Sequence, residues 1–541
     1  MDGTAKHSRP ASDIAICLSG FILTCLLCFL YLTLNGNSLQ VTYGDTWIFT
    51  DLAKRIAFTH SLRMDAVFDI IYPPLYPALI SVAYFFKDPD AIFKAIMALN
   101  VFVYSSAFVP LYFLLKDYAR LTGRQSFCGA VVLLINLWPL RYVAHIASEP
   151  LYYALAAWFA WLLVDGAYLR TKTCLAAFIA VLTALPLTKT LGNIVFPCFI
   201  GFSCLLYFFS ERPRSSRLIT RPLLAFSISV LALYLYKKYQ LSALPQSGDI
   251  TGGYLYNLSC SNLLQPSYWI DRTRLDLSWL IRGTKTAAVP LFLALFIGNR
   301  KLLVRDPLVI FTAFVFAGTF VIVPLFTPTD PMFREHPRYY IPFVFSFVVI
   351  LFKYHRFIGS RELLVAAALL TAGIAAGFPP TFLREPIRWQ IGVYYCVWFG
   401  CLYYGRKVFV NTLLALMCVS SLLSIWGDRK PPSEETGAIT GFYDPYGITK
   451  AIIDTRAARP DAEVLVDRSW RGQNLDTWRE YERVMTGLPF LPVFADIDDR
   501  LAEKKNGEKV SLLVTNKPIK NAKKAVQGKH INLYLLEKTP A

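Results

Sequence analysis

Four charged residues in or beside apolar stretches are of the types that group transfer to a hydroxyl would need. Asp45 lies in the polar stretch TYGDTWIF, and Glu149 lies in HIASEPLYY between two apolar runs. Lys189 stands in LPLTKTLG and Arg338 in FREHPRYYIP. A carboxylate can take the proton of an attacking hydroxyl, and a cation can balance negative charge that grows on a leaving phosphate. Such chemistry requires a fold that brings these distant positions together.

The composition is that of a membrane protein. The chain of 541 residues is 55% hydrophobic and 15% aromatic, and apolar runs near twenty residues recur from Ile14 to Trp426, which is typical of a polytopic membrane protein. The net charge of +18 would suit nucleic acid, but Lys and Arg lie mainly in short links between apolar runs. That placement is the orientation signal of membrane helices, so we expect membrane lipids and no nucleic acid as partners.

The apolar runs predict a mainly α-helical membrane domain over residues 14–426 with about thirteen transmembrane helices. If residues 1–13 are cytoplasmic, all the inward links are basic, as the positive-inside rule requires. An odd number of crossings then places the C-terminus outside. The expected runs are 14–34, 91–116, 127–147, 150–169, 174–190, 193–209, 219–237, 284–298, 307–327, 339–353, 362–378, 389–404 and 408–426.

Two shorter stretches are expected to lie in the outer interface of the membrane. Residues 74–86, PPLYPALISVAYF, would form a helix about 20 Å long, which is too short for a hydrocarbon core about 30 Å thick. Over about 46–60, the apolar residues Trp47, Ile48 and Leu52 share one helical face. We therefore predict two amphipathic interfacial helices, at about 46–60 and 74–86.

The composition changes after Trp426. The linker GDRKPPSEETG opens a polar segment, residues 427–541, in which the strand-like runs AEVLVD, VSLLVT and INLYLLE alternate with helical stretches such as ITKAIIDTRAA. This pattern predicts a small extracytoplasmic α/β domain. Neither G-x-G-x-x-G nor G-x-x-x-x-G-K-[ST] accompanies the strands, so we expect no nucleotide cofactor.

Each of the four charged residues also has a purely structural interpretation. Asp45 could cap the helix that follows it, and in the SEP sequence the serine could be the cap while Glu149 faces the positive helix end. Lys189 and Arg338 could reach lipid headgroups. The threading places Asp45 and Glu149 on the same outer side, which favours a shared catalytic role. For the two cations, the functional alternative is to hold a phosphate.

The order of these landmarks resembles the glycosyltransferase C superfamily. The landmarks are an acidic loop after the first run, two interfacial helices, YPPLYP, SEP, TKT, RYYIP and an outer C-terminal domain. Within the superfamily, the chain is similar to the bacterial branch related to protein O-mannosyltransferases and to the aminoarabinose transferases that modify lipid A. The landmarks cover about residues 12–355. The resemblance implies a donor sugar carried on a polyprenyl phosphate.

The resemblance also implies roles for individual residues. Asp45 corresponds to the acidic residue of the family's first loop, a catalytic carboxylate, and Glu149 to the acidic position that opens the fourth span. Lys189 corresponds to the lysine that faces the donor phosphate in the aminoarabinose branch, and Arg338 would contact the same phosphate. A divalent metal held by Asp45 and Glu149 could assist the reaction.

The chain departs from the aminoarabinose transferases at one place. Those enzymes carry an acidic residue and a lysine immediately before the proline of the second interfacial helix, whereas Tyr72 and Pro73 precede Pro74 here. This difference disfavours aminoarabinose as the transferred sugar.

The sequence therefore predicts a multi-pass enzyme of the cytoplasmic (inner) membrane. It would transfer a hexosyl or pentosyl group, with inversion, from a polyprenyl phosphate to a lipid, glycan or protein acceptor at the extracytoplasmic face. The long outer loop, residues 238–283, is expected to gate the donor cavity. A secondary transporter would be expected to show intramembrane charges and matching halves, which we do not find. A polymerase or ligase of surface glycans that uses the same donors stays open as an alternative.

Overall fold

The computed structural model describes most of the helical part of the chain and the strands of its C-terminal part. The described residues are 11–34, 45–62, 72–86, 89–209, 216–241, 266, 288–326, 337–377, 387–405 and 408–427, with the strands between 463 and 536. Within helices, the side chains of some of these residues, among them Asp45 and Arg338, are not described.

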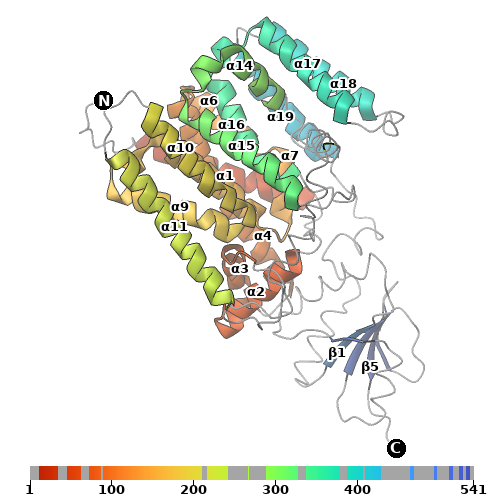
Figure 1. The fold of residues 1–541 in the computed structure, drawn as a ribbon. Coiled ribbons are helices and arrows are strands. Elements are labelled where there is room, and N and C mark those ends of the chain that lie inside the picture. Colours follow the sequence, from red (N-terminus) through yellow and green to blue (C-terminus); the bar gives the residue numbers. More distant parts are fainter. Residues whose placement is uncertain are drawn as a thin grey trace, which may run out of the picture.

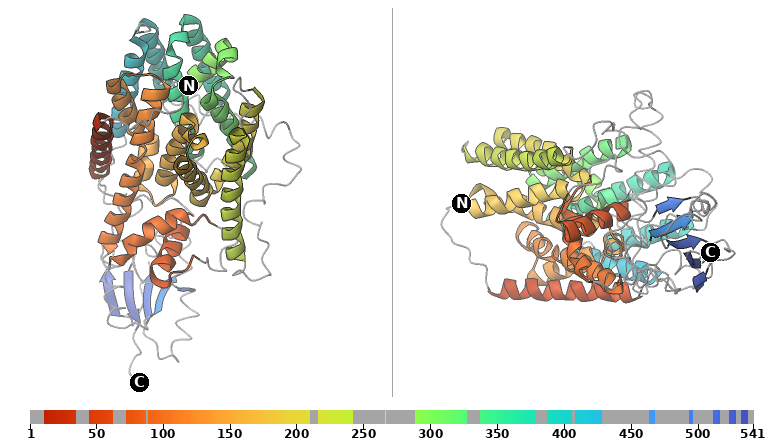
Figure 2. Two further views of the ribbon diagram at one scale, coloured as in Figure 1. Left: turned by 90° about the vertical axis from the view of Figure 1, so that its left-hand side faces the viewer. Right: turned by 90° about the horizontal axis from the view of Figure 1, so that it is seen from below.

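The helices pack side by side into an elongated body (Figures 1 and 2). Each predicted apolar run contains at least one helix. Besides short 3-10 and π-helical turns and the helices α2 and α3, the described helices are α1 (Ala11–Leu34), α4 (Pro89–Ser105), α5 (Phe108–Phe113), α6 (Gly123–Leu134), α7 (Leu137–Arg141), α8 (Glu149–Asp165), α9 (Lys172–Thr188), α10 (Val195–Phe209), α11 (Arg217–Leu241), α14 (Ala288–Leu303), α15 (Pro307–Phe326), α16 (Pro337–Lys353), α17 (Ser360–Gly377), α18 (Ile387–Tyr404) and α19 (Phe409–Gly427).

The membrane character of this body follows from length and hydropathy. Among the described residues, four helical stretches are long and apolar enough to cross a membrane unaided: Ala11–Leu34, Lys94–Tyr118, Arg217–Gln240 and Phe409–Trp426. Apolar side chains of α1 and α11 are exposed, including Leu26 and Leu231 at 61% and 55%, as expected for surfaces in contact with lipid tails. The predicted total of thirteen crossings stays a prediction.

Helices are present at both predicted interfacial stretches. α2 (Asp45–Thr59) packs against α3 (Leu75–Ile80) and against the 3-10 helix η1 (Ser81–Phe85) that continues α3. Phe49 of α2 forms edge-to-face contacts with the rings of Tyr72 and Tyr76, with ring centroids 5.8 and 5.4 Å apart. α2 and α3 lie together at one end of the helical body (Figures 1 and 2).

The predicted run 127–147 is not one helix. α6 ends at Leu134, α7 begins at Leu137, and a 3-10 helix, η3 (Tyr142–Ala144), follows before the chain reaches α8. Pro139 explains the interruption, because proline cannot donate a backbone hydrogen bond to the preceding turn and its ring clashes there. The chain therefore approaches the SEP sequence as an irregular, buried segment.

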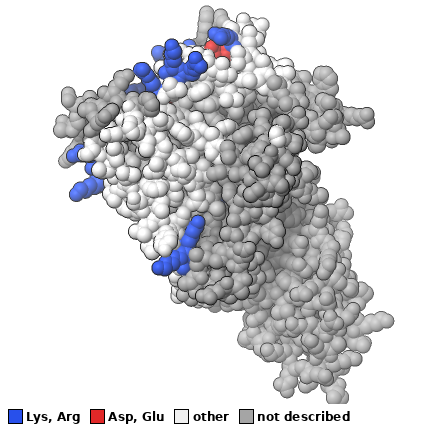
Figure 3. Space-filling model, viewed as in Figure 1, with Lys and Arg blue, Asp and Glu red and all other residues white. Residues whose placement is uncertain are grey.

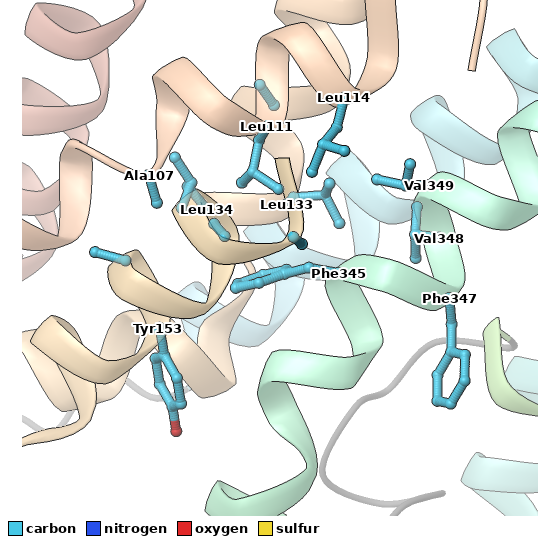
Figure 4. Packing of buried hydrophobic residues seen from close by; sticks show 14 of the residues in the cluster. Ala107, Leu111, Leu114, Leu133, Leu134, Tyr153, Phe345, Phe347, Val348 and Val349 are labelled. Atoms are coloured by element: carbon cyan, nitrogen blue, oxygen red, sulfur yellow. The ribbon is translucent and has the colours of Figure 1, made fainter. Parts of the chain in front are cut away.

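One continuous apolar core joins the helices. Phe159, Phe178 and Phe199, from α8, α9 and α10, form a buried ring cluster, with the Phe178 and Phe199 centroids 5.2 Å apart. α16 packs against α8, and Figure 4 shows Phe345 of α16 in the same cluster as Leu134 and Tyr153, so the second half of the body packs on the first.

Basic residues gather at the end of the body opposite α2 and α3. Figure 3 shows Lys and Arg grouped over the end where α14 and α17 lie, then a broad uncharged band, and a smaller basic group at the lower end of α11, where Lys237 and Lys238 are exposed. Exposed basic residues of the predicted inward links, such as Arg305, Arg356 and Arg361, come from this part of the chain.

Asp306 anchors that basic end. Its buried carboxylate accepts hydrogen bonds from the hydroxyls of Tyr118 and Tyr354, at 2.5 and 2.6 Å, and pairs with the ammonium group of Lys353. It also accepts from the Leu308 backbone N–H at 2.9 Å, which caps α15. The ends of α15 and α16 are thereby fastened to the π-helical turn at Leu114–Tyr118.

The C-terminal part contains a five-stranded sheet with strand order β2-β1-β3-β5-β4. Its strands are β1 (Glu463–Asp467), β2 (Val493–Ala495), β3 (Ser511–Thr515), β4 (Lys523–Gln527) and β5 (Asn532–Leu536). β1 runs parallel to β2 and β3, whereas β5 is antiparallel to β3 and β4. The three predicted strands are confirmed as β1, β3 and β5. The helices predicted in this segment, such as ITKAIIDTRAA, lie outside the described residues.

Candidate functional site

Glu149 is the first residue of α8 and is only 1% exposed. Ser148 occupies the N-cap position, but its side chain makes no capping hydrogen bond. Pro150 follows in the first turn, where a missing N–H costs nothing. The carboxylate therefore lies at the positive end of the helix dipole, a placement that both the structural and the catalytic interpretations share.

Lys189 follows the last residue of α9 in an extended conformation, with φ −150° and ψ 134°. The chain then turns sharply, because the Gly192 N–H donates to the Lys189 carbonyl at 2.8 Å. A Cβ at Gly192 would lie 2.5 Å from the backbone carbonyl of Leu185, so only glycine fits this turn. The turn fixes the place from which the Lys189 side chain extends.

The ammonium group of Lys189 forms an ion pair with the carboxylate of Glu149. The side chains are 12% and 2% exposed, respectively, so the pair is almost wholly removed from water. Removing one partner of such a buried pair would leave an uncompensated charge away from water, which is strongly disfavoured. The sequence placed both residues on the same side of the membrane but did not predict this contact.

Two further buried side chains, Tyr76 and Asn100, join the segment that leads into Glu149 to α3 and α4. Tyr76 of α3 donates its hydroxyl hydrogen bond to the Oδ1 of Asn100 of α4, at 3.2 Å. The Asn100 amide nitrogen donates to the carbonyls of His145 and Val143, at 2.8 and 3.3 Å. α3 and α4 are thus tied to the irregular segment that leads into Glu149.

The negative charge of Glu149 affects the pKa of the Tyr76 hydroxyl. Burial is the largest cause that raises the pKa of Tyr76, and the negative charge of Glu149 raises it further. The hydrogen bonds that Tyr76 shares with Asn100 and with the backbone of Ala147 lower the pKa of Tyr76 without reversing the shift. Tyr76 therefore stays protonated and acts as a hydrogen-bond donor beside the carboxylate.

The C-terminal end of α11 holds the chain between the two short helices. Gln240 donates to the carbonyl of Leu62 at 2.5 Å, and the hydroxyl of Tyr236 donates to the carbonyl of Tyr72 at 2.7 Å. These bonds fix the two points where the chain leaves α2 and enters α3. The predicted gating loop, 238–283, begins in this last turn of α11. Beyond residue 241 the structure describes only residue 266 of the loop.

For Asp45 and Arg338, the structure describes the position of the backbone but not that of the side chain. Asp45 is the first residue of α2, and Arg338 is the second residue of α16. Their side chains lie outside what the structure describes, so the predicted convergence of Asp45 with Glu149 stays a prediction.

Neither a known protein family nor a curated protein matches the chain by sequence. Among solved structures, ArnT from Cupriavidus metallidurans bound to undecaprenyl phosphate superimposes with a TM-score of 0.56 and 12% sequence identity, over 95% of this chain and 97% of that chain. The chain has the glycosyltransferase C fold. The apo oligosaccharyltransferase of Archaeoglobus fulgidus matches with a TM-score of 0.49 and 11% identity, over 92% of this chain and 69% of that chain.

On this glycosyltransferase C fold, Tyr76 and Asn100 are site-adjacent residues that the sequence analysis missed. Asn100 did carry a signal, since it is a lone amide within the apolar stretch AIMALNVFVY. A polar side chain in a membrane segment faces the protein interior and finds partners there. Tyr76 was noticed as part of YPPLYP but not as a functional side chain.

A metal site built on Glu149 is disfavoured by its surroundings. The described residues contain no cluster of three or more His, Cys, Asp or Glu side chains that could hold a metal ion. The Glu149 carboxylate already carries the ammonium group of Lys189, and a divalent cation at the same oxygen would be repelled by that charge. The Asp45 half of the predicted metal site lies outside the described side chains.

Proposed function

We propose that this protein is an integral membrane glycosyltransferase that moves a pentosyl or hexosyl group from a polyprenyl phosphate to a lipid, glycan or protein acceptor. The reaction would take place at the extracytoplasmic face of the cytoplasmic membrane and invert the anomeric centre. The observation that carries the proposal is the buried Glu149–Lys189 pair on a glycosyltransferase C fold.

The position of this pair supports the proposed orientation. Tyr76 of α3 adjoins Glu149, and α3 lies at the end of the body opposite the exposed basic links (Figures 1 and 3). Basic links mark the cytoplasmic side of membrane proteins, which supports an outer position for the end with α3 and Glu149. A donor presented from the bilayer fits a chain with no nucleotide-binding motif. The similar fold of ArnT, a protein crystallised with undecaprenyl phosphate, supports a donor of this type.

In the proposed reaction, Asp45 removes the proton from the acceptor hydroxyl, whose oxygen attacks the anomeric carbon of the sugar. The bond from that carbon to the phosphate oxygen breaks, and its electron pair leaves with polyprenyl phosphate. Lys189, oriented by Glu149, and Arg338 balance the charge that grows on the phosphate. A carboxylate base contributes about 10² to 10⁴ in rate. No step requires a metal.

Substitution of Asp45 tests the base. Purified Asp45→Asn protein should fail to transfer sugar from radiolabelled undecaprenyl-phosphate pentoses or hexoses to an envelope extract, while its thermal transition stays at the wild-type temperature. The lost carboxylate removes the proton acceptor but keeps the side-chain size. Transfer by the variant at the wild-type rate would show that Asp45 is not the base.

The donor class is tested by binding and by chemistry together. Wild-type protein should bind undecaprenyl phosphate in native mass spectrometry and release it from at least one labelled donor. A wild type that neither binds undecaprenyl phosphate nor transfers any sugar would overturn the proposed function. Uptake of a solute by proteoliposomes without sugar transfer would favour a transporter instead.

A further inference from the structure

The segment between α7 and α8 is buried but is not a regular helix. Val143 and Ile146 are fully buried, and Ala147 is 2% exposed. Tyr142 and Ser148 of this segment have helical partners for their carbonyls, but a buried carbonyl without such a partner needs a donor from elsewhere in the protein. The way these carbonyls are satisfied decides where α8, and with it Glu149, begins.

Asn100 supplies the donors. Its amide nitrogen lies 2.8 Å from the His145 carbonyl oxygen and 3.3 Å from the Val143 carbonyl oxygen, and its own oxygen accepts from Tyr76. Asn100 is fully buried, so these groups cannot exchange their partners for bulk water. Its amide therefore joins α3 and α4 to two points on the approach to Glu149.

The usual device for fixing a helix start is not used here. Ser148 stands at the N-cap of α8 without a side-chain capping bond, although serine is well suited to that role. The backbone of Ala147, two residues before Glu149, instead acts as a hydrogen-bond partner that lowers the pKa of the Tyr76 hydroxyl. The start of α8 is thus held from α3 and α4 rather than by its own cap.

We propose that Tyr76 and Asn100 are positioning residues that set the place of Glu149 and, through its ion pair, of the Lys189 ammonium group. This inference rests on the proposed function, because it assigns the two residues to the transfer step. It also couples the second predicted interfacial helix, α3, to the charge pair. A shift of about 1 Å at a reacting group can lower a rate about a hundredfold, so the loss of one hydroxyl at Tyr76 should be measurable.

Two chemically identical substitutions separate positioning from general stability. Tyr76→Phe removes a hydroxyl that bonds to Asn100, whereas Tyr104→Phe removes one that donates to the Leu134 carbonyl at 2.7 Å. Both tyrosines are fully buried. Tyr104 lies on α4, one turn after Asn100, but its bond is made to the end of α6.

Turnover and donor binding should respond differently in these variants. Tyr76→Phe should lower kcat for release of undecaprenyl phosphate about tenfold or more and change the Kd for undecaprenyl phosphate less than twofold, because Lys189 keeps its charge. Tyr104→Phe should keep wild-type kcat while losing a similar amount of thermal stability. Equal kcat values for the two variants would overturn the inference.

Hydrogen exchange gives a readout that does not depend on turnover. The amide hydrogens of peptides that cover residues 143–149 should exchange faster in Tyr76→Phe and in Asn100→Leu than in the wild type. In Tyr104→Phe their exchange rate should equal that of the wild type. If Asn100→Leu does not fold, Asn100→Asp, which keeps the acceptor for Tyr76 but loses the amide donors, takes its place. Unchanged exchange in both Tyr76→Phe and the Asn100 variant would also overturn the inference.

The two proposals fail in different ways. A wild type that transfers no sugar and binds no undecaprenyl phosphate refutes the proposed function, and the role of Tyr76 and Asn100 in transfer falls with it. An active wild type in which Tyr76→Phe keeps full turnover refutes the positioning role alone.

Discussion

Removing one or both charges of the Glu149–Lys189 pair separates its structural role from its chemical role. Glu149→Gln keeps the size of the side chain but leaves the Lys189 ammonium group without a counter-charge at a site where only 12% of its side chain is exposed. Breaking a buried pair by removing one partner costs about 3 to 5 kcal/mol. Glutamine still accepts a hydrogen bond, so we expect the lower value, about 3 kcal/mol, or about a hundredfold in the unfolding equilibrium.

The double variant Glu149→Gln with Lys189→Met removes both charges together. Replacing a buried pair by uncharged side chains of similar size is often neutral, so the double variant should regain most of the stability that each single variant loses. Sugar transfer should stay lost in the double variant and in Lys189→Met alone, because the Lys189 ammonium group is absent from both, and it should fall in Glu149→Gln, where that group is no longer oriented by the carboxylate. Stability is measured by equilibrium unfolding in mixed micelles with rising SDS, followed by tryptophan fluorescence, and transfer by release of undecaprenyl phosphate.

Two results would refute this reasoning. A double variant as unstable as the single variants would mean that the two charges do not stabilise each other. Wild-type turnover in the double variant would mean that Lys189 does not act on the phosphate.

Two further predictions concern the other end of the molecule and the threading. Asp306→Asn should lower the free energy of unfolding by about 3 kcal/mol without changing kcat, because the Asp306 carboxylate, 1% exposed, pairs with Lys353 and accepts from two tyrosine hydroxyls. Asp13→Asn is the matched control with a smaller loss, since the Asp13 side chain is 9% exposed and accepts from one tyrosine beside its pair with Lys116. Equal losses in SDS unfolding would contradict this ranking. Single cysteines placed at Ser216 and Ser247 in a cysteine-free background should show opposite labelling in intact cells, with an impermeant maleimide reaching position 247 only. Labelling at 216 and not at 247 would invert the orientation.

The helical framework and the strands of the C-terminal sheet were predictable, because both depend on local patterns. The runs 14–34 and 219–237 appear as α1 and α11, and the alternating strands appear as β1, β3 and β5. β2 and β4 were missed, since a strand of three residues and the polar sequence KKAVQ carry little alternation. The break in the run 127–147 could have been predicted from Pro139. The run is mostly apolar, however, and apolar composition alone predicts one continuous helix.

The site was predictable only in part, because its contacts join residues far apart in the chain. The SEP and TKT sequences were identified, yet nothing local indicates that Glu149 and Lys189, 40 positions apart, form an ion pair. The bond from Asn100 to His145 spans 45 positions. Such contacts depend on how α4, α8 and α9 pack, which the periodicity of each helix alone does not specify.

The irregular approach to α8 also constrains how the protein enters the membrane. A growing chain exposes residue 100 well before residue 145, by about 2 to 9 seconds for 45 positions at 5 to 20 residues per second. The Asn100 amide has therefore already been synthesised when the carbonyls of Val143 and His145, to which it donates, leave the ribosome. A circular permutation that moves α4 behind α8 reverses that order. During insertion, the carbonyls of Val143 and His145 would then lack the hydrogen bonds from Asn100, so the permuted protein should insert into the membrane less efficiently.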